Sequence, residues 1–583
     1  MCIRDRIYLA LYGIKQEREA DLDEEAIVCL ARLDELNPHQ FAQVFKAAKG
    51  KNPDILSYEE AMSDYENLKD WLASALKEIR QLEKKGVWVE CEKSEAKGQQ
   101  IIPCTWVFRY KRNPAGEIIK CKARICLRGD LMEDDSNTYA PVVQSPSIKG
   151  FITTSLKKDW VMISVDWVNA FPQAELKKPL FMHTPRGFRN KFGRNGCLKL
   201  GRSLYGSKFA PLNWYEHLLE ALHKLGFKQC PHDPCLLFRP GMMMILYVDD
   251  AGLAAPCRED IEKFVEELRE LGFDLEIEGD FTEYLGIAID KEANGTRRMH
   301  QKGLINKIIE TTKMTSCNPN HTPAMQAALG SDPEGEDWAN EDWNYASIVG
   351  MLLYVSNNTR PDIAFAVSQV ARFTAKPKVS HASAIKSIVR YLKGTIDKGL
   401  VFTVNDNYDL ACWVDADFAG LFGREPPNSP QSVKSRYGYV IEFGGIPLVW
   451  KSQLISEICT STCHAEYVGL SNALRRLLPI RELVMWLLKQ LELPDQKTSI
   501  GCKVFEDNQS AYTLATKQQL SVRTKWFAVK YHWFWSYVYH EKRNPKGFVN
   551  IEECSTDLMN ADYLTKGLQR TKFEANRKRV QGW

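Results

Sequence analysis

Hydrophobic and polar residues follow two different periods along the chain, and each period predicts a different kind of element. Apolar residues recur every three or four positions in the segments 58–86, 147–158, 212–227 and 259–272, which predicts amphipathic helices. In the first of these helices the apolar face consists of Leu68, Trp71, Leu72, Ala75, Ile79 and Leu82.

Shorter apolar runs, rich in β-branched and aromatic residues, predict strands. These runs are 105–113, 117–129, 160–171, 242–250, 283–290 and 400–420. Asn113-Pro114-Ala115-Gly116, between the first two runs, is a turn sequence that predicts a hairpin. The acidic stretch GSDPEGEDWANEDW, 330–343, is the best linker candidate because it is rich in turn residues. After a polar helical lead-in, the pattern therefore predicts two α/β units joined by a helical middle.

Length and charge limit the class of protein. A chain of 583 residues is too long for one core and predicts two to four domains. Lys and Arg number 77 against 74 Asp and Glu, so no overall basic charge indicates a nucleic-acid partner, although a local basic channel remains compatible with this balance. The 16 cysteines include no CxxC pair, which favours free intracellular thiols over zinc ligands. No apolar run reaches the ~20 residues of a membrane span, and we expect no membrane partner.

Two adjacent carboxylates, Asp249 and Asp250, follow the most apolar segment of the chain, MMMILYV. Asp166 follows a second strand-like segment in the same way. Any one of these residues alone is better explained as a turn or cap. Two strands that each deliver carboxylates at their ends, however, can hold two divalent cations about 3.5–4 Å apart. The three aspartates together therefore predict a metal site, and Mg²⁺ suits it because this ion combines few carboxylates with substrate phosphates and water.

The motifs around these aspartates resemble, in order and spacing, the reverse transcriptases of copia-type long-terminal-repeat retrotransposons. The resemblance extends over residues 55–575 or so. Its motifs are WVFRYKRNPAGEIIKCKARICLRG, YAPVVQSPSI, VDWVNAF, RSLYGSKFAPLNWY, ILYVDD, EYLGI and YASIVGMLLYVSNNTRPDIAFAVSQVARF. Two segments depart from the family: the part before YAPVV is short, and KFAPLNW replaces a version that contains glutamine. Neither departure removes one of the three aspartates.

The resemblance implies a role for each residue of this first site. Asp166, Asp249 and Asp250 would bind two Mg²⁺ (or Mn²⁺) ions and catalyse nucleotidyl transfer. Phe171 would lie under the incoming sugar and exclude a 2′-hydroxyl; the alternative is an ordinary core phenylalanine.

Three further residues would bind the substrate. Lys122 and Arg124 would contact the triphosphate, and the alternative is a solvated strand face. Gly206 would let the backbone approach the base pair closely, and the alternative is a plain turn glycine. Leu285-Gly286 would form a hairpin that supports the primer.

Four more acids follow in the last third of the chain: Asp415, Glu466, Asp507 and Asp562. They resemble the catalytic set of the ribonuclease H domain that follows the polymerase in copia-type elements, which implies a second pair of Mg²⁺ (or Mn²⁺) ions that activate water against RNA.

The ribonuclease H resemblance has departures. His464 stands where the family usually carries an acid two residues before the catalytic glutamate, and Trp526 stands where the family commonly has histidine. His532 is present and has a structural alternative. All four carboxylates are nevertheless retained.

The resemblance also implies a fold and domain bounds. The expected fold is α/β (α+β): a right-hand reverse transcriptase with fingers, palm and thumb, a connection region and an RNase H-like α/β domain. We expect a polar lead-in at 1–54, fingers and palm at 55–290, a thumb or connection at 291–400 and the RNase H-like domain at 401–583. The first residues, MCIRDR, resemble translated sequencing-adapter sequence, and we expect the chain to be the C-terminal portion of a polyprotein.

The implied function is RNA-directed DNA polymerase with ribonuclease H, an endonuclease, in the life cycle of a transposing element. The implied partners are an RNA template, a DNA/RNA hybrid, dNTPs, a primer (a tRNA in related elements) and other parts of the polyprotein. No targeting signal is visible, and reverse transcription in such elements occurs in cytoplasmic virus-like particles. The alternative is a catalytically silent remnant that only binds nucleic acid. The retention of seven carboxylates argues against long neutral decay.

Overall fold

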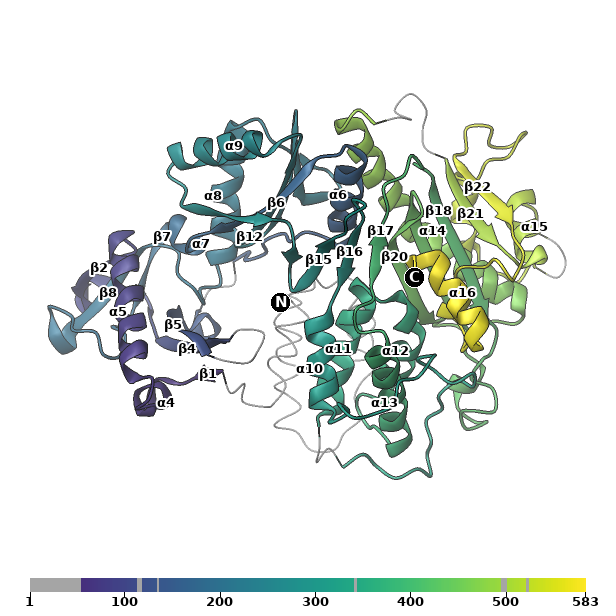
Figure 1. Cartoon of the computed structure of the whole chain (residues 1–583), viewed down its shortest axis with the longest axis horizontal. Coiled ribbons are helices and arrows are strands. Elements are labelled where there is room, and N and C mark those ends of the chain that lie inside the picture. Colours follow the sequence, from purple (N-terminus) through teal and green to yellow (C-terminus); the bar gives the residue numbers. More distant parts are fainter. Residues whose placement is uncertain (1–53, 113–117, 134–135, 340–342, 494–500, 521–523) are drawn as a thin grey trace.

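The computed structural model describes residues 54–112, 118–133, 136–339, 343–493, 501–520 and 524–583 (Figure 1). The predicted lead-in, apart from Asp54, and the predicted turn at 113–116 lie outside these residues. The remaining chain is a mixed α/β protein, as expected, and its described strands form five sheets.

A six-stranded antiparallel sheet contains the first group of predicted aspartates. Its strand order is β13 (Leu275–Asp280), β6 (Val161–Trp167), β12 (Asp250–Ala255), β11 (Met242–Tyr247), β10 (Asp233–Arg239) and β9 (Lys228–Cys230). Every residue of β11 is buried, which agrees with its uninterrupted apolar sequence. The helices of this region are α6 (Ser145–Lys157), α7 (Ala170–Gln173), α8 (Ala210–Lys224) and α9 (Arg258–Glu270). The predicted helices at 147–158, 212–227 and 259–272 are thereby confirmed.

Two smaller sheets combine strands that precede β6 with two strands that follow it, and lie at the left of Figure 1. One has the order β1 (Ile55–Leu56), β4 (Cys104–Arg112), β5 (Ile118–Leu127). The other has the order β2 (Trp88–Glu92), β8 (Gly196–Arg202), β7 (Glu175–Met182), β3 (Ile101–Ile102). Together with two helices they enclose an apolar core of their own around Trp71 and Phe108.

The single helix predicted at 58–86 is wrong in one respect. The chain forms two helices, α4 (Tyr58–Ser63) and α5 (Leu68–Lys84), separated by a turn at Asp64–Asn67. The Asp64 carboxylate accepts hydrogen bonds from Asn67 Nδ2, from Trp71 Nε1 at 2.8 Å and from the Tyr110 hydroxyl. These side-chain bonds tie the turn to α5 and to β4. Leu72, predicted in the apolar face, is 47% exposed.

A helical region follows the six-stranded sheet. It consists of α10 (Lys302–Thr311), α11 (Tyr345–Asn358), α12 (Ala364–Ala371) and α13 (Val379–Gly394). A four-stranded sheet accompanies these helices, with the order β14 (Glu283–Tyr284), β15 (Ile287–Lys291), β16 (Arg297–His300), β17 (Leu400–Phe402). The first three strands precede the helices in the sequence, and β17 follows α13 and pairs with β16.

The last sheet is mixed. Its order is β20 (Ile446–Leu454), β19 (Arg436–Phe443), β18 (Leu410–Asp417), β21 (Cys502–Glu506), β22 (Val549–Glu553), and β18, β21 and β22 run parallel. The helices of this part are α14 (Thr462–Gln490), α15 (Gln509–Lys517) and α16 (Arg570–Gln581).

The six-stranded sheet, the helical region and the last sheet share one continuous apolar core. Helix α6 joins them directly: the fully buried Lys149 donates from Nζ to the Leu448 carbonyl at 3.0 Å and lies 3.9 Å from the centre of the Trp450 ring. Both ends of the predicted linker at 330–343 are packed, since Gly330 lies against the Arg424 carbonyl and Trp343 is buried. Most of the described residues between these ends are exposed, namely Pro333, Glu334, Glu336, Asp337 and Ala339. The predicted domain bounds stay a prediction.

Among the described residues, no helix has the length and apolar character needed to cross a membrane.

Candidate functional site

The hairpin of β11 and β12 brings the first group of aspartates to the end of the six-stranded sheet. Asp250 is the directly paired neighbour of Asp166 on β6. Tyr247 pairs with Asp250, so the loop between the strands contains only Val248 and Asp249. Val248 has a φ of 50°, and its carbonyl accepts a 2.6 Å hydrogen bond from Trp214 Nε1. The buried indole thus stabilises a strained two-residue turn.

The three aspartates lie in one electrostatic neighbourhood. Burial, Glu278 and Asp249 raise the pKa of Asp166 to about 6, although Lys122 opposes the shift. Burial, Asp249 and Asp166 raise the pKa of Asp250 to about 7. Carboxylates crowded in this way favour a bound cation, which would remove their mutual repulsion.

Two acids that sequence reasoning missed also line this site. Glu276 on β13 pairs directly with Asp166. Glu278 follows at an irregularity in the pairing between Ile277 and Gly279, and its charge raises the pKa of both Asp166 and Asp250. A bulge next to an active site commonly re-aims a side chain. The signal was the alternation in LEIEGD, which puts both glutamates on one strand face.

The predicted triphosphate contacts, Lys122 and Arg124, share one face of β5 and are half-buried. Burial and Arg124 lower the pKa of Lys122 to about 8. Glu78, a buried acid of α5 that sequence reasoning missed, lies near both cations, while burial raises its pKa. Of the two cations, Lys122 lies near enough to Asp166 to oppose the rise of its pKa.

An aromatic pair connects these cations with the predicted sugar-binding residue. The Arg124 guanidinium lies 4.6 Å from the centre of the Tyr205 ring, and Tyr205 packs edge-on against Phe171 at 5.3 Å. Phe171 follows β6 on the short helix α7 and remains half-buried. Tyr205, which was quoted only as part of SLYGSK, is thus the residue that joins the two predicted contacts.

Gly206 has a structural requirement of its own. Its φ is +83°, and a Cβ built on it would lie 2.1 Å from the Leu127 carbonyl oxygen of β5. Gly206 therefore approaches the chain's own backbone closely, and its approach to a base pair stays a prediction. Leu285 and Gly286 both have positive φ and form the tip of the β14–β15 hairpin.

The second group of acids is more tightly gathered. Asp415 lies in β18, Glu466 in the first turns of α14 and Asp507 directly after β21. One carboxylate oxygen from each lies within 4.8 Å of the others. Among the described residues, no other group of three potential ligands meets this distance. The three aspartates of the first site, Asp166, Asp249 and Asp250, do not meet it either. In the first site, Asp166 and Asp250 occupy paired strand positions, whereas Asp249 lies in the turn between β11 and β12.

Close packing of α14 on the sheet explains how Glu466 reaches the strand ends. A Cβ on Gly469, one turn further along the helix, would lie 3.2 Å from Tyr437 Cβ on β19. Burial and Lys566 act in opposite directions on Asp415, and the sum raises its pKa to about 7. Burial and Glu506 raise the pKa of Glu466 well above its usual value. Glu506, fully buried and missed by sequence reasoning, is a further acid beside the trio.

The fourth predicted acid, Asp562, lies beside the trio rather than within it. Its buried carboxylate is 2.5 Å from Nζ of Lys566 and 2.5 Å from Nζ of Lys572. The Thr565 hydroxyl donates to Asp415, which ties this segment to the trio.

The two residues that depart from the ribonuclease H resemblance have different surroundings. The His464 ring stacks on Phe527 at 4.4 Å, whereas Trp526 is 77% exposed. The His532 Nδ1 lies 2.9 Å from the Tyr467 hydroxyl, which supports its structural interpretation.

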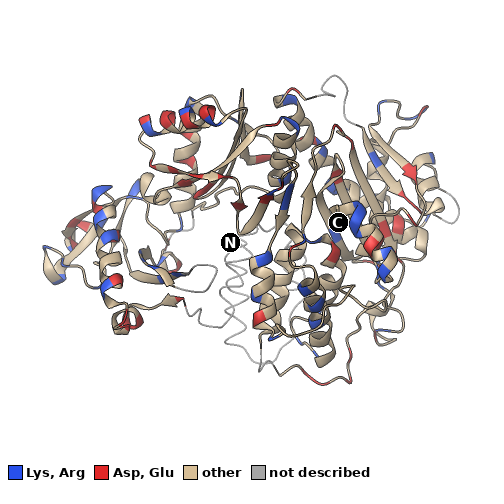
Figure 2. Ribbon diagram, viewed as in Figure 1, with Lys and Arg blue, Asp and Glu red and all other residues tan. Residues whose placement is uncertain are grey.

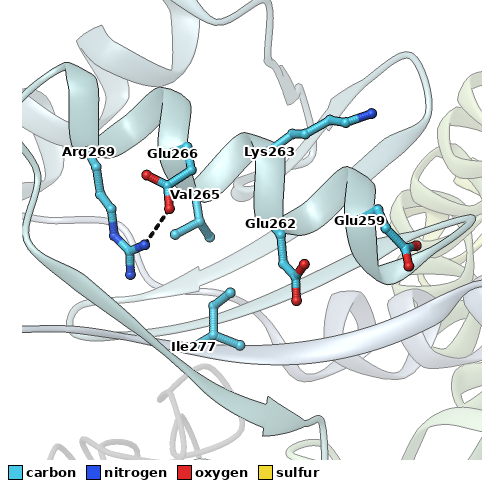
Figure 3. Close-up of a pocket in the computed structure, with 7 residues that line it drawn as sticks. All are labelled: Glu259, Glu262, Lys263, Val265, Glu266, Arg269 and Ile277. Atoms are coloured by element: carbon cyan, nitrogen blue, oxygen red, sulfur yellow. Dashed lines mark hydrogen bonds and ion pairs between the residues drawn. The ribbon is translucent and has the colours of Figure 1, made fainter.

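A surface hollow of about 540 Å³ is separate from both groups of acids. It lies between α9 and β13 and is lined by Glu259, Glu262, Lys263, Val265, Glu266, Arg269 and Ile277 (Figure 3). Charges of both signs alternate along α9 (Figure 2). Ile277 is offset by one residue from Glu276, so the hollow faces away from Asp166.

Comparison with known proteins identifies the region around the first site. Residues 89–326 match the family model described as reverse transcriptase (RNA-dependent DNA polymerase). This part of the chain is a reverse transcriptase domain. The domain thus contains Asp166, Asp249 and Asp250 as well as the residues of the aromatic pair.

Relatives extend the similarity beyond this domain. The chain is 29% identical over 540 residues to the Pol polyprotein of transposon TNT 1-94 from Nicotiana tabacum, covering 89% of this chain and 38% of the relative. It is 28% identical over 481 residues to the Pol polyprotein of transposon RE1 from Arabidopsis thaliana, covering 81% and 31%. The resemblance to copia-type retrotransposon polyproteins is confirmed, and the chain spans about a third of the length of these relatives.

A solved foamy viral protease-reverse transcriptase in complex with double-stranded DNA superposes on 83% of this chain and 69% of its own, with 12% identity and a TM-score of 0.44. This likeness is too weak to support an inference about the site.

Proposed function

We propose that the chain copies RNA into DNA by metal-dependent nucleotidyl transfer. The observation that carries this proposal is the direct pairing of Asp166 with Asp250, beside the Val248–Asp249 turn, within a reverse transcriptase domain. Two divalent ions, Mg²⁺ or Mn²⁺, would activate the primer 3′-hydroxyl and stabilise the leaving pyrophosphate when bound. Asp166, Asp249 and Asp250 would hold them, because clustered carboxylates with raised pKa values suit a cation.

The other residues of the site would orient the substrate. Lys122 and Arg124 would attract the triphosphate from β5, and Arg124 is already oriented by its contact with Tyr205. Phe171, supported by Tyr205, would limit the space at the sugar 2′-position. Template, primer and dNTPs are the corresponding partners, and the contacts to them would be mainly to phosphates because copying cannot depend on sequence.

We also propose that Asp415, Glu466 and Asp507 form a ribonuclease H site that cleaves the RNA strand of the hybrid. The gathering of their oxygens within 4.8 Å favours this function, since that spacing fits a shared divalent ion. Mg²⁺ or Mn²⁺ at this site would supply an activated water, and the protein would supply the carboxylate ligands.

The test of polymerase activity is dNTP incorporation on a poly(rA)/oligo(dT) template with Mg²⁺ or Mn²⁺. Wild type should incorporate dNTPs, and Asp249→Asn should lose incorporation by about 10²–10³-fold, since Asn keeps the shape but not the charge. Asp280→Asn, at an exposed residue of the neighbouring β13, is the matched control and should retain activity. A folded wild-type chain that incorporates nothing with either ion would instead favour the silent, nucleic-acid-binding remnant.

The nuclease test is cleavage of an RNA strand annealed to DNA, comparing wild type with Asp415→Asn and with Asp249→Asn. Asp415→Asn should abolish cleavage and leave dNTP incorporation intact, and Asp249→Asn should do the reverse. If both variants lose both activities, the two sites are not independent and this assignment fails.

A further inference from the structure

Two lysines approach the buried acids of the proposed nuclease site from the solvent side. Lys566 Nζ lies 2.5 Å from Asp562 Oδ1 and 3.8 Å from Asp415 Oδ2. Lys572 Nζ lies 2.5 Å from Asp562 Oδ2. The two lysine side chains are 37% and 33% exposed, whereas the two aspartates are almost completely buried. The ammonium groups can therefore reach water, and the carboxylates cannot.

The acids divide into two sets that share Asp415. The first is Asp415, Glu466 and Asp507, whose ligand oxygens lie within 4.8 Å of one another. The second is Asp415 and Asp562, and Lys566 bridges it. A two-metal centre needs two neighbouring cation positions, one on each side of a shared carboxylate. Lys566 therefore contacts the carboxylates that would hold the second ion.

We propose that Lys566 is an internal cation that fills the second metal position of the nuclease site until an RNA/DNA hybrid binds. This inference rests on the nuclease function proposed above. The ammonium and a divalent ion cannot share the Asp415–Asp562 pair, because like charges at such distances repel strongly. When the hybrid enters, its phosphate adds negative charge that favours the divalent ion, and the lysine side chain moves to solvent.

The backbone around Lys566 limits this movement to the side chain. The preceding residue, Thr565, donates its hydroxyl to Asp415. The following residue, Gly567, is packed so tightly that a Cβ would lie 2.1 Å from the Met325 carbonyl oxygen. Lys566 thus sits between two anchored neighbours, and its flexible four-carbon stem is the part that can swing. Lys572, on α16, contacts Oδ2 of Asp562, whereas Lys566 contacts Oδ1, so the position between Asp415 and Asp562 is occupied by Lys566.

The test counts Mn²⁺ ions bound to the full chain without nucleic acid, by calorimetric titration. Asp249→Asn and Asp250→Asn are combined in every sample so that the polymerase site does not contribute. With Lys566 intact we expect one ion at the nuclease site, and with Lys566→Met we expect two. Lys572→Met is the matched control, because this lysine contacts Asp562 but is not paired with Asp415, and its sample should bind one ion.

A second readout is the Mg²⁺ concentration for half-maximal hybrid cleavage. It should fall on the order of tenfold in Lys566→Met, which corresponds to the loss of one charged contact of about 1.4 kcal/mol. Lys566→Arg keeps the charge and should not lower it. One bound ion in Lys566→Met together with an unchanged Mg²⁺ requirement would overturn the proposal, and so would two ions in the sample with Lys566 intact.

A third measurement applies even if Lys566→Met does not fold. The chain with Lys566 intact is titrated with Mn²⁺ in the presence of a duplex of 2′-O-methyl RNA and DNA, which lacks the 2′-hydroxyl. The number of bound ions should rise from one to two, and an unchanged number would contradict the inference. If wild type cleaves no hybrid and Asp415→Asn does not alter Mn²⁺ binding, the nuclease function itself fails. If wild type passes both checks and Lys566→Met changes nothing, only the role of Lys566 fails.

Discussion

Asp166 of β6 and Asp250 of β12 are directly paired residues of two antiparallel strands. Their carboxylates therefore lie on the same face of the sheet, and each raises the cost of ionising the other. The pKa values of about 6 and about 7 follow from this arrangement together with burial.

This pairing predicts how stability depends on pH in the metal-free protein. Because the folded pKa of Asp250 is raised, its stabilising contribution is fully present below pH 3.8 and is lost as the pH rises through about 7. The asparagine in Asp250→Asn does not titrate. The free energy of unfolding of this variant should therefore rise by about 1–2 kcal/mol relative to that of wild type as the pH goes from 5 to 8. Thermal melts at the two pH values, in a chelating buffer, measure this difference. An equal difference at both would show that Asp250 is not perturbed.

Added Mg²⁺ should stabilise wild type more at pH 8 than at pH 5. Metal binding requires ionised carboxylates, so protons compete with the ion below about pH 7. The shift in melting temperature as Mg²⁺ is titrated measures this effect. Asp250→Asn should lose the part of the melting-temperature shift that comes from the first site, and Asp415→Asn the part that comes from the second. The two variants thus distinguish the contributions of the two sites. A shift that is the same at both pH values would argue against carboxylate ligands.

Phe171→Val should relax the discrimination between rNTPs and dNTPs. The smaller side chain opens space beside Tyr205, and we expect the ratio of rNTP to dNTP incorporation to rise about 10–100-fold. Steady-state incorporation of each nucleotide class is the measurement. Tyr205→Phe keeps the supporting ring and serves as the control. If the ratio stays constant while the melting temperature falls, Phe171 is an ordinary core residue.

Gly206→Ala should destabilise the protein by about 2–4 kcal/mol, because it combines a left-handed backbone with a clash against Leu127. Since Leu127 ends β5, the displaced strand should also weaken dNTP binding by Lys122 and Arg124. The measurements are a denaturant titration and KM for dNTP. Gly201→Ala is the matched control, because a Cβ there would meet no atom within 4 Å. Equal effects at both glycines would contradict the packing argument.

Lys149→Met should leave stability at pH 7 unchanged or raise it, because a buried cation is replaced by an apolar side chain of similar size. Burial lowers the pKa of Lys149, so wild type should gain stability as the pH rises toward 10, and the variant should not. Denaturant titrations at pH 7 and 9.5 test this, with Lys158→Met at the end of the same helix as control.

The amino-acid pattern alone was enough to predict the mixed α/β class, the helices near 147–158, 212–227 and 259–272, and the acids at the strand ends. Apolar periodicity reports burial directly, and an uninterrupted run such as MMMILYV can only be a strand covered on both faces or a buried helix. The ordered motifs then identified the reverse transcriptase domain, which comparison confirmed.

Which residues come into contact depends on how the elements pack against one another. Pairing across strands put Glu276 opposite Asp166, and the packing of β5 put Arg124 over Tyr205. The turn at Asp64 depends on a contact with Tyr110, 46 positions further along the chain. The place of Lys566 between Asp415 and Asp562 depends on a contact with Asp415, 151 positions before it. The periodicity of apolar residues predicts one helix or strand at a time. Contacts between charged residues form between different elements, and the sequence pattern does not specify the register in which those elements pair.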